Sequence, residues 1–180
     1  MIIEIPDFIK QPERLRDFAL SQVFTDFNAP DGECYKRVCI QDIPEIREAL
    51  LEVLPEAEIL GMGFRLNFND ELPNQLVHSD LGWGTHALVV YLSDGPGGTA
   101  FWKHKDTGTV LIDTGDTELL ETLQKDWDNE DAWELRYLCQ GSPGKGVVYT
   151  GKLYHSRYPF KAYGNSAESG RLVAVAFFNL

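Results

Sequence analysis

The stretch THALVVYLSDGPGGTAFW, residues 85–102, decides the fold class of this chain. Residues 87–92 form a near-continuous apolar run that is rich in valine, which is typical of a buried strand. The sequence Gly-Pro-Gly-Gly at 95–98 is turn chemistry, and residues 99–103 return as a second strand. Short runs of the same kind recur at 59–69, 76–80, 147–150 and 172–178. Many short strands with glycine turns between them predict a sandwich or a barrel.

Helical patterns flank this β-rich part of the chain. After a short strand at 1–5, helices are predicted at 12–24 and 44–54, each opened by a proline at its first position. An acidic segment at 113–131 also has a helical pattern and interrupts the strands. The sequence therefore predicts one domain over 1–180, with a helical N-terminal support at about 1–58 and a β core at about 59–180.

Composition narrows the classes of partner. The 180 residues carry 16 basic and 28 acidic side chains, which gives a formal net charge of −12. The electric field of this charge disfavours binding to the negatively charged backbone of nucleic acids. No apolar run approaches the roughly 18 residues of a membrane span. The three cysteines form no disulfide framework, so we expect reduced thiols and a cytoplasmic location.

The triplet His78-Ser79-Asp80 is the first candidate site. Side chains at i and i+2 of a strand point to the same face, so this imidazole and carboxylate can converge on one metal ion. His155 is the candidate third ligand. Two histidines and one carboxylate on one face of an octahedron leave three positions open, which suits Fe(II) that also binds a keto acid and O₂. An isolated His-x-Asp triplet is more often structural, and that alternative stays open on this pattern alone.

Arg171 is the second candidate, because it opens the apolar strand at 172–178 and a guanidinium matches the geometry of a carboxylate. A surface arginine at a strand end is the competing interpretation. Arg65 and Asn67, on the strand at 59–69, either reach a bound ligand or are ordinary strand residues. Trp83 either lines the entrance for the substrate or has only a structural role.

Six elements in order resemble the prolyl 4-hydroxylase-like branch of the Fe(II)- and 2-oxoglutarate-dependent oxygenases. They are the His-x-Asp triplet, the strand ending in Tyr-Leu-Ser-Asp, the Gly-Gly-x-x-Phe element, a glycine turn before VVYT, the distal histidine, and the arginine before LVAVAFFN. The resemblance covers residues 63–179. It implies a double-stranded β-helix, which is a cupin-like jelly roll, mainly β with flanking helices.

The resemblance also implies roles for single residues. His78, Asp80 and His155 match the iron ligands and so the catalytic centre, Arg171 matches the residue that pairs with the distal carboxylate of 2-oxoglutarate, and Tyr91 matches a tyrosine that supports it. The implied reaction hydroxylates a C–H bond while 2-oxoglutarate becomes succinate. The gap between His155 and Arg171 is longer than is usual in the family.

The substrate is expected to be a small molecule or a peptide side chain, without nucleic acid or membrane as a partner. The segment 113–131 is a candidate lid, and Lys152, Arg157 and Lys161 are a candidate basic rim around His155. The competing function is a non-catalytic or differently metallated cupin-like protein. Arg171 argues against it, because a plain metal-binding module needs no carboxylate anchor.

Overall fold

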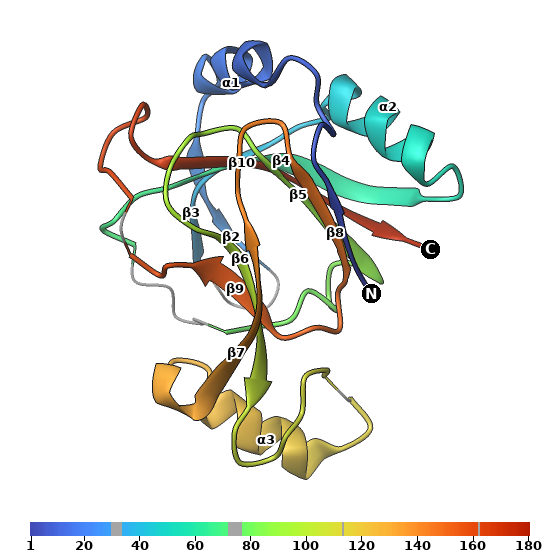
Figure 1. Ribbon diagram of the computed structural model, residues 1–180, viewed down its shortest axis with the longest axis vertical. Helices are drawn as coiled ribbons and strands as arrows, with labels where there is room; N and C mark the ends of the chain where they lie inside the picture. The colour runs from blue at the N-terminus through green and yellow to red at the C-terminus, as the bar shows by residue number, and fades with distance from the viewer. Residues whose placement is uncertain (30–33, 72–76, 113, 162) are drawn as a thin grey trace.

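Two antiparallel sheets face each other in the computed structural model of the chain, which describes residues 1–29, 34–71, 77–112, 114–161 and 163–180 (Figure 1). The larger sheet has the strand order β1-β8-β5-β10-β4-β3-β2, and the smaller has the order β7-β6-β9. The strands are β1 (Ile2–Ile5), β2 (Thr25–Asn28), β3 (Cys34–Ile40), β4 (Glu58–Asn67), β5 (His86–Tyr91), β6 (Gly98–His104), β7 (Trp133–Gln140), β8 (Gly146–Thr150), β9 (His155–Tyr158) and β10 (Arg171–Asn179).

The order in which the chain visits the two sheets makes the fold a jelly roll. From β4 the chain passes to a bridge between His78 and His155 at the edge of the smaller sheet, and then returns to β5 in the larger one. It next builds β6 and β7 in the smaller sheet, β8 in the larger, β9 in the smaller and β10 in the larger. Eight segments alternating in this way form a double-stranded β-helix, as the sequence predicts.

The central strands are apolar throughout because both of their faces are buried. On β5, Leu88 and Val90 point to an outer core, whereas Val89 and Tyr91 point to the core between the sheets. The period of two along a strand thus supplies two different cores from one apolar run. This explains why residues 87–92 show no polar alternation.

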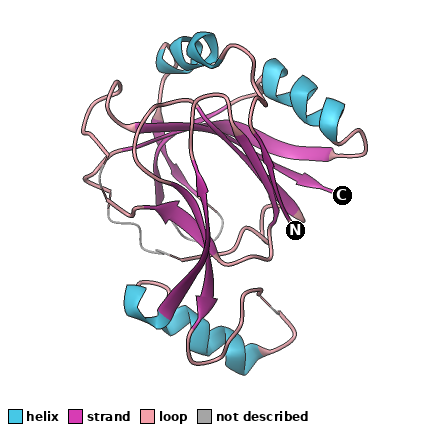
Figure 2. Ribbon diagram, in the orientation of Figure 1, coloured by secondary structure: helices cyan, strands magenta, loops and turns pink. Residues whose placement is uncertain are grey.

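Three helices cover the outer faces (Figure 2). Helices α1 (Pro12–Leu20) and α2 (Pro44–Val53) pack on the larger sheet through Leu15, Ile46 and Leu50. Helix α3 (Thr117–Lys125) packs beneath the smaller sheet (Figure 1), where Leu123 joins a core with Trp102. Among the described residues, no helix is both long and apolar enough to cross a membrane.

Helix α1 ends at Leu20, earlier than the predicted residue 24. The hydroxyl of Ser21 donates to the carbonyl oxygen of Phe18 at 2.7 Å, and the amide of Gln22 donates to the same oxygen at 3.1 Å. These side chains add to the backbone amide of Ser21, which also donates to the Phe18 carbonyl at 3.1 Å, and together they cap the end of the helix. Helix α3 is shorter than the predicted 113–131, of which residue 113 lies outside the described residues.

Four strands have no counterpart in the prediction: β2, β3, β7 and β9. Strand β7 keeps one face exposed, and β3 carries Lys36 and Arg37, so neither shows an apolar run. Strands β2 and β3 fall in the N-terminal region that the sequence describes as helical support, and they extend the larger sheet beyond β4. The predicted strand at 76–80 is a single bridge at His78 in its described part, and residue 76 lies outside that part.

Candidate metal centre

Backbone pairing brings the two candidate histidine ligands together. The amide of His78 donates to the carbonyl of His155 at 3.0 Å, and the amide of His155 donates to the carbonyl of His78 at 2.8 Å. The amide of Asp80 donates to the carbonyl of Gly151 at 2.9 Å, which fixes the turn that carries the carboxylate. A Cβ at residue 151 would lie 2.7 Å from the Gly84 carbonyl oxygen and 3.2 Å from the Asp80 carbonyl carbon, so this approach requires glycine.

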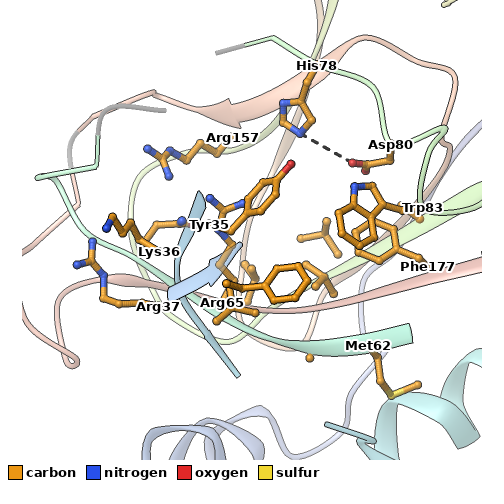
Figure 3. Close-up of a pocket in the computed structure, with 18 of the residues that line it drawn as sticks. Tyr35, Lys36, Arg37, Met62, Arg65, His78, Asp80, Trp83, Arg157 and Phe177 are labelled. Atoms are coloured by element: carbon orange, nitrogen blue, oxygen red, sulfur yellow. Dashed lines mark ion pairs between the residues drawn. The ribbon is translucent and has the colours of Figure 1, made fainter. Parts of the chain in front are cut away.

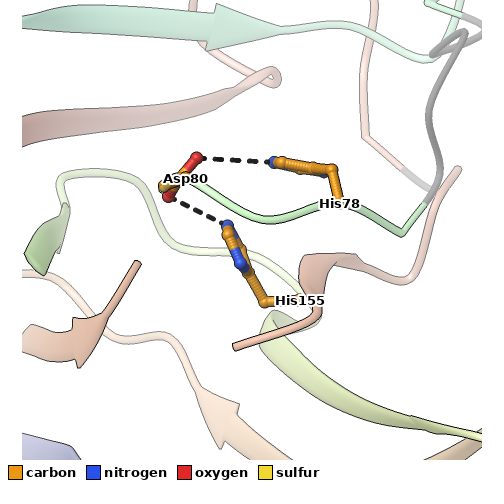
Figure 4. Close-up of side chains that lie close together, drawn as sticks. All are labelled: His78, Asp80 and His155. Carbon is orange, nitrogen blue, oxygen red and sulfur yellow. Dashed lines mark ion pairs between the residues drawn. The ribbon is translucent and has the colours of Figure 1, made fainter. Parts of the chain in front are cut away.

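The three predicted ligands converge, as Figure 4 shows. One donor atom from each of His78, Asp80 and His155 lies within 4.8 Å of the other two. Asp80 Oδ2 is 3.1 Å from His155 Nε2, and Asp80 Oδ1 is 3.9 Å from His78 Nε2. This donor set and its convergence on one side fit a metal ion with open coordination positions.

The side chains of Asp80 and His155 shift each other's pKa. Burial opposes ionisation of Asp80, but the neighbouring charges of His155 and His78 outweigh it and hold the pKa of this carboxyl well below its usual range. Burial also disfavours the charged form of His155, yet the Asp80 carboxylate outweighs this and raises the pKa of His155. A hydrogen bond of 2.9 Å joins His155 Nδ1 to the carbonyl of Leu153, so Nδ1 carries the proton and Nε2 faces the centre.

Tyr149 adds a fourth polar group that the sequence did not single out. Its hydroxyl donates to Asp80 Oδ2 at 2.8 Å and lies 3.1 Å from His155 Nε2. The side chain is buried, and burial together with the Asp80 carboxylate raises the pKa of its hydroxyl well above the usual range. Tyr149 therefore remains a protonated donor that orients the carboxylate.

A cavity of about 840 Å³ opens beside this centre (Figure 3). Its lining includes all three candidate ligands, the inner face of β4 and β10, and parts of β2 and β3. Trp83 stacks on Phe177 with ring centroids 5.5 Å apart, and Phe27 and Tyr35 contact the same indole. The volume is in the range of sites that enclose small molecules.

Arg171 lines the same cavity. Its guanidinium donates to Asn67 Oδ1 at 3.0 Å and lies 5.6 Å from the centroid of the Tyr91 ring. Among the described residues no carboxylate forms an ion pair with Arg171. Tyr91 sits behind it in the core between the sheets, and its hydroxyl shares a 2.7 Å hydrogen bond with Thr99. The ring of Tyr91 thus contacts the guanidinium of Arg171. The predicted contact between the Tyr91 hydroxyl and a ligand stays a prediction.

Glu71 is the buried centre of an arginine network along one side of the cavity. Its carboxylate accepts from Arg157 at 2.6 Å, from Arg37 at 2.9 Å and from the amide of Asn67 at 2.9 Å. Arg65 lies 3.8 Å from the same carboxylate and 5.1 Å from the centroid of the Tyr35 ring. The predicted basic rim is therefore only partly present, since Arg157 lines the cavity but Lys152 and Lys161 do not.

The acidic segment does not cover the cavity. None of its described residues, 114–131, lines the cavity, and α3 packs instead on the outer side of the smaller sheet. The reason is its apolar stripe, which supplies Leu119 and Leu123 to the core around Trp102 and Trp133. The lid interpretation of this segment is wrong for its described part, and strands β2 and β3 form the wall instead.

The other histidines lie outside the centre. His104 is fully buried and lies 3.0 Å from Asp126 Oδ2, and His86 stacks on Phe178. Sequence reasoning missed Tyr149, Tyr35 and Glu71 as lining residues. Only Tyr149 had a usable signal, because it alternates with Val147 on the inner face of a predicted strand.

Comparison with known proteins matches the chain to no family model and to no curated protein. Solved structures do match. SnoK, a non-heme alpha-ketoglutarate-dependent carbocyclase from nogalamycin biosynthesis, is 14% identical with a TM-score of 0.62, over 98% of this chain and 78% of that one. HygX from Streptomyces hygroscopicus, with nickel and 2-oxoglutarate bound, is 13% identical with a TM-score of 0.62, over 97% and 81%.

The chain has the fold of 2-oxoglutarate-dependent non-heme enzymes. EctD from S. alaskensis, with bound Fe, also shares it at 14% identity and a TM-score of 0.52, over 97% of this chain and 71% of EctD. At these identities the likeness concerns the fold, and the argument for function comes from the residues of the site.

Proposed function

We propose that this chain is a dioxygenase that uses Fe(II) and 2-oxoglutarate to hydroxylate a small molecule or a protein side chain. One observation carries the proposal. A His-Asp-His trio, of which Asp80 and His155 are buried, lines the same cavity as an arginine without a carboxylate partner among the described residues. A metal ligand set explains the trio, and an anionic cosubstrate explains the arginine.

The residues present fit Fe(II). His78, Asp80 and His155 would hold it through two imidazole nitrogens and one carboxylate oxygen, a donor set typical of non-heme iron oxygenases. In this class of reaction a bound Fe(II) supplies the oxygen-activating chemistry. The net change is that a C–H compound, O₂ and 2-oxoglutarate give the alcohol, succinate and CO₂.

The remaining residues bind, orient and exclude water. Arg171 pairs with the distal carboxylate of 2-oxoglutarate, and the Tyr91 ring beneath it holds the guanidinium in place. Tyr149 keeps Asp80 oriented by donating to Oδ2, which leaves Oδ1 toward the metal. The side chains of Val173, Val175 and Phe177 make one wall of the cavity apolar and so keep water from the reacting atoms.

The substrate class is a small molecule or a peptide rather than a nucleic acid. Aromatic side chains line one end of the cavity, and the net charge of −12 repels a polyanion at long range. The structural neighbours named above include a carbocyclase, so the prolyl 4-hydroxylase-like branch stays a prediction from the sequence motifs. Three free cysteines favour a reducing compartment, and we propose the cytoplasm.

The test is formation of succinate from 2-oxoglutarate by purified protein reconstituted with Fe(II) under air. We expect slow, substrate-independent succinate formation with matching O₂ consumption, and none from the His155→Ala variant. If the wild-type protein binds metal tightly but forms no succinate at saturating 2-oxoglutarate, the competing function is correct, and the chain is a metal-binding protein without catalysis.

A further inference from the structure

The cavity holds more positive charge than its carboxylates neutralise. Among the described residues five lysine or arginine side chains line it. Three of them have close carboxylate partners: Lys36 with Asp26 at 2.7 Å, Arg37 with Asp70 at 2.7 Å, and Arg157 with Glu71 at 2.6 Å. The other two are Arg65 and Arg171.

Arg65 is the cation that the proposed function does not use. Its one ion-pair distance, 3.8 Å to Glu71 Oε2, is beyond hydrogen-bonding reach, and that oxygen already accepts from Arg157 and Asn67. Its buried Nε has no hydrogen-bond partner among the described residues. Burial lowers the pKa of Arg65 to about 10, and repulsion from Arg157 and Arg171 adds to this against the attraction of Glu71. Arg65 is partly buried, and a partly buried guanidinium without a hydrogen-bonded carboxylate gains from pairing with an anion.

Sheet register places Arg65 between two ends of the cavity. On the inner face, Asn67 of β4 pairs with Arg171 of β10, Arg65 pairs with Val173, and Gly61 pairs with Phe177. Arg65 therefore belongs to the inner-face pair next to that of Arg171, the proposed cosubstrate anchor. It lies between Arg171 and the aromatic end of the cavity. In Figure 3, Arg65 lies behind Tyr35, and Trp83 and Phe177 lie on the side of Asp80.

The floor at the aromatic end of the cavity, opposite Phe177, is open. A Cβ added at Gly61 would meet no atom within 4 Å, although Gly61 lines the cavity. Above this floor Trp83 and Phe177 stack at an interplanar angle of 26° and present an apolar surface. The space therefore suits an apolar body that begins beside a positive charge.

We propose that the substrate is an organic acid whose carboxylate pairs with Arg65 and whose apolar body packs over Gly61 against Trp83 and Phe177. This inference rests on the proposed function, in which Arg171 is occupied by 2-oxoglutarate. It narrows the substrate from any small molecule or peptide to one that carries a carboxylate at the end opposite its apolar part. A peptide meets the requirement through an acidic side chain or its terminal carboxylate.

The test compares matched pairs of ligands, each an aromatic or branched alkyl carboxylic acid and its uncharged amide. Binding is measured by calorimetry to anaerobic protein saturated with Fe(II) and 2-oxoglutarate. In wild type we expect the acids to bind about ten- to a hundredfold more tightly than their amides, as loss of a charge-assisted pair would cost. Arg65→Met should remove this preference, and Arg65→Lys should retain part of it.

Two further variants separate charge from shape. Arg136→Met removes an exposed arginine on β7, outside the cavity, and should keep the full preference. Gly61→Leu fills the open floor of the cavity and should weaken the binding of acids and amides alike. Absence of an acid preference in wild type, or its survival in Arg65→Met, would overturn the inference.

A metal-free arm keeps the inference distinguishable from the proposed function. This arm uses the Arg171→Met variant without metal. Among the described residues, Arg65 is then the remaining lining guanidinium without a close carboxylate partner. Any preference of this variant for acids over amides should therefore vanish when Arg65→Met is added. If that preference holds while succinate formation fails, the proposed function is wrong and the acid site stands. If succinate forms and the preference is absent, the acid site alone is wrong.

Discussion

The hydroxyl of Tyr149 on β8 donates a 2.8 Å hydrogen bond to Oδ2 of Asp80, which lies in the turn between the His78 bridge and β5. This contact links the larger sheet to the carboxylate of the candidate metal centre across the interior of the jelly roll. It fixes which oxygen of Asp80 remains available to a metal.

Removal of this hydroxyl should weaken metal binding. We expect Tyr149→Phe to lower the affinity for Fe(II) or Co(II) by about ten- to a hundredfold, the range for residues that orient metal ligands. Tyr154→Phe is a matched control, because it removes a buried hydroxyl that has no hydrogen-bond partner among the described residues. Equal affinities of the two variants would show that Tyr149 does not orient Asp80.

Metal binding should depend on pH through His155. The Asp80 carboxylate raises the pKa of His155, so the imidazole still holds its proton at pH values where an ordinary histidine has lost it. A metal must displace that proton, and affinity should therefore fall as pH drops through the raised pKa. Calorimetry in buffers of different ionisation enthalpy should detect proton release at the ordinary histidine pKa of about 6.5, and this release should decline over the more alkaline range above it. Release that does not change over this range would contradict the pairing.

The cosubstrate anchor is tested by Arg171→Met. Loss of a charge-assisted contact to a carboxylate costs about 1.5–3 kcal/mol, so 2-oxoglutarate should bind about ten- to a hundredfold more weakly while the metal affinity is unchanged. Lys152→Met, an exposed lysine near His155 in sequence, is the control and should bind 2-oxoglutarate normally. If Arg171→Met binds 2-oxoglutarate as wild type does, Arg157 is the next residue to test, since it lines the cavity.

Gly151→Ala should damage both the fold and the site. The new Cβ would collide with the backbone of Gly84 and Asp80, which cannot move without displacing the carboxylate. We expect about 1–3 kcal/mol of lost stability in urea unfolding, together with weaker metal binding. Gly95→Ala is the matched control because its Cβ would meet no atom within 4 Å. A stable Gly151→Ala protein with normal metal affinity would show that the turn tolerates the shift.

The apolar runs at 87–92 and 172–178 were sufficient to predict the β-rich fold, because a strand buried on both faces needs apolar side chains at every position. The His-x-Asp spacing likewise placed His78 and Asp80 near each other, although Asp80 lies in the turn after the His78 bridge and not on the strand that the sequence predicted. The same reasoning failed for β3 and β7. Strand β3 joins β4 across helix α2, strand β7 joins β6 across helix α3, and their exposed faces let polar residues hide the pattern.

Other features were decided by tertiary structure alone. The pairing of His78 with His155 and the hydrogen bond from Tyr149 to Asp80 both join segments far apart in the chain. The carboxylate of Glu71 is likewise occupied by Arg157 from a distant strand, which leaves Arg65 at 3.8 Å from it. Spacing along a strand says which face a side chain takes, but not which residue of another sheet it meets. The sequence thus determined the strands and the types of ligand, whereas packing of the two sheets decided which groups share the cavity and which charge in it remains without a close partner.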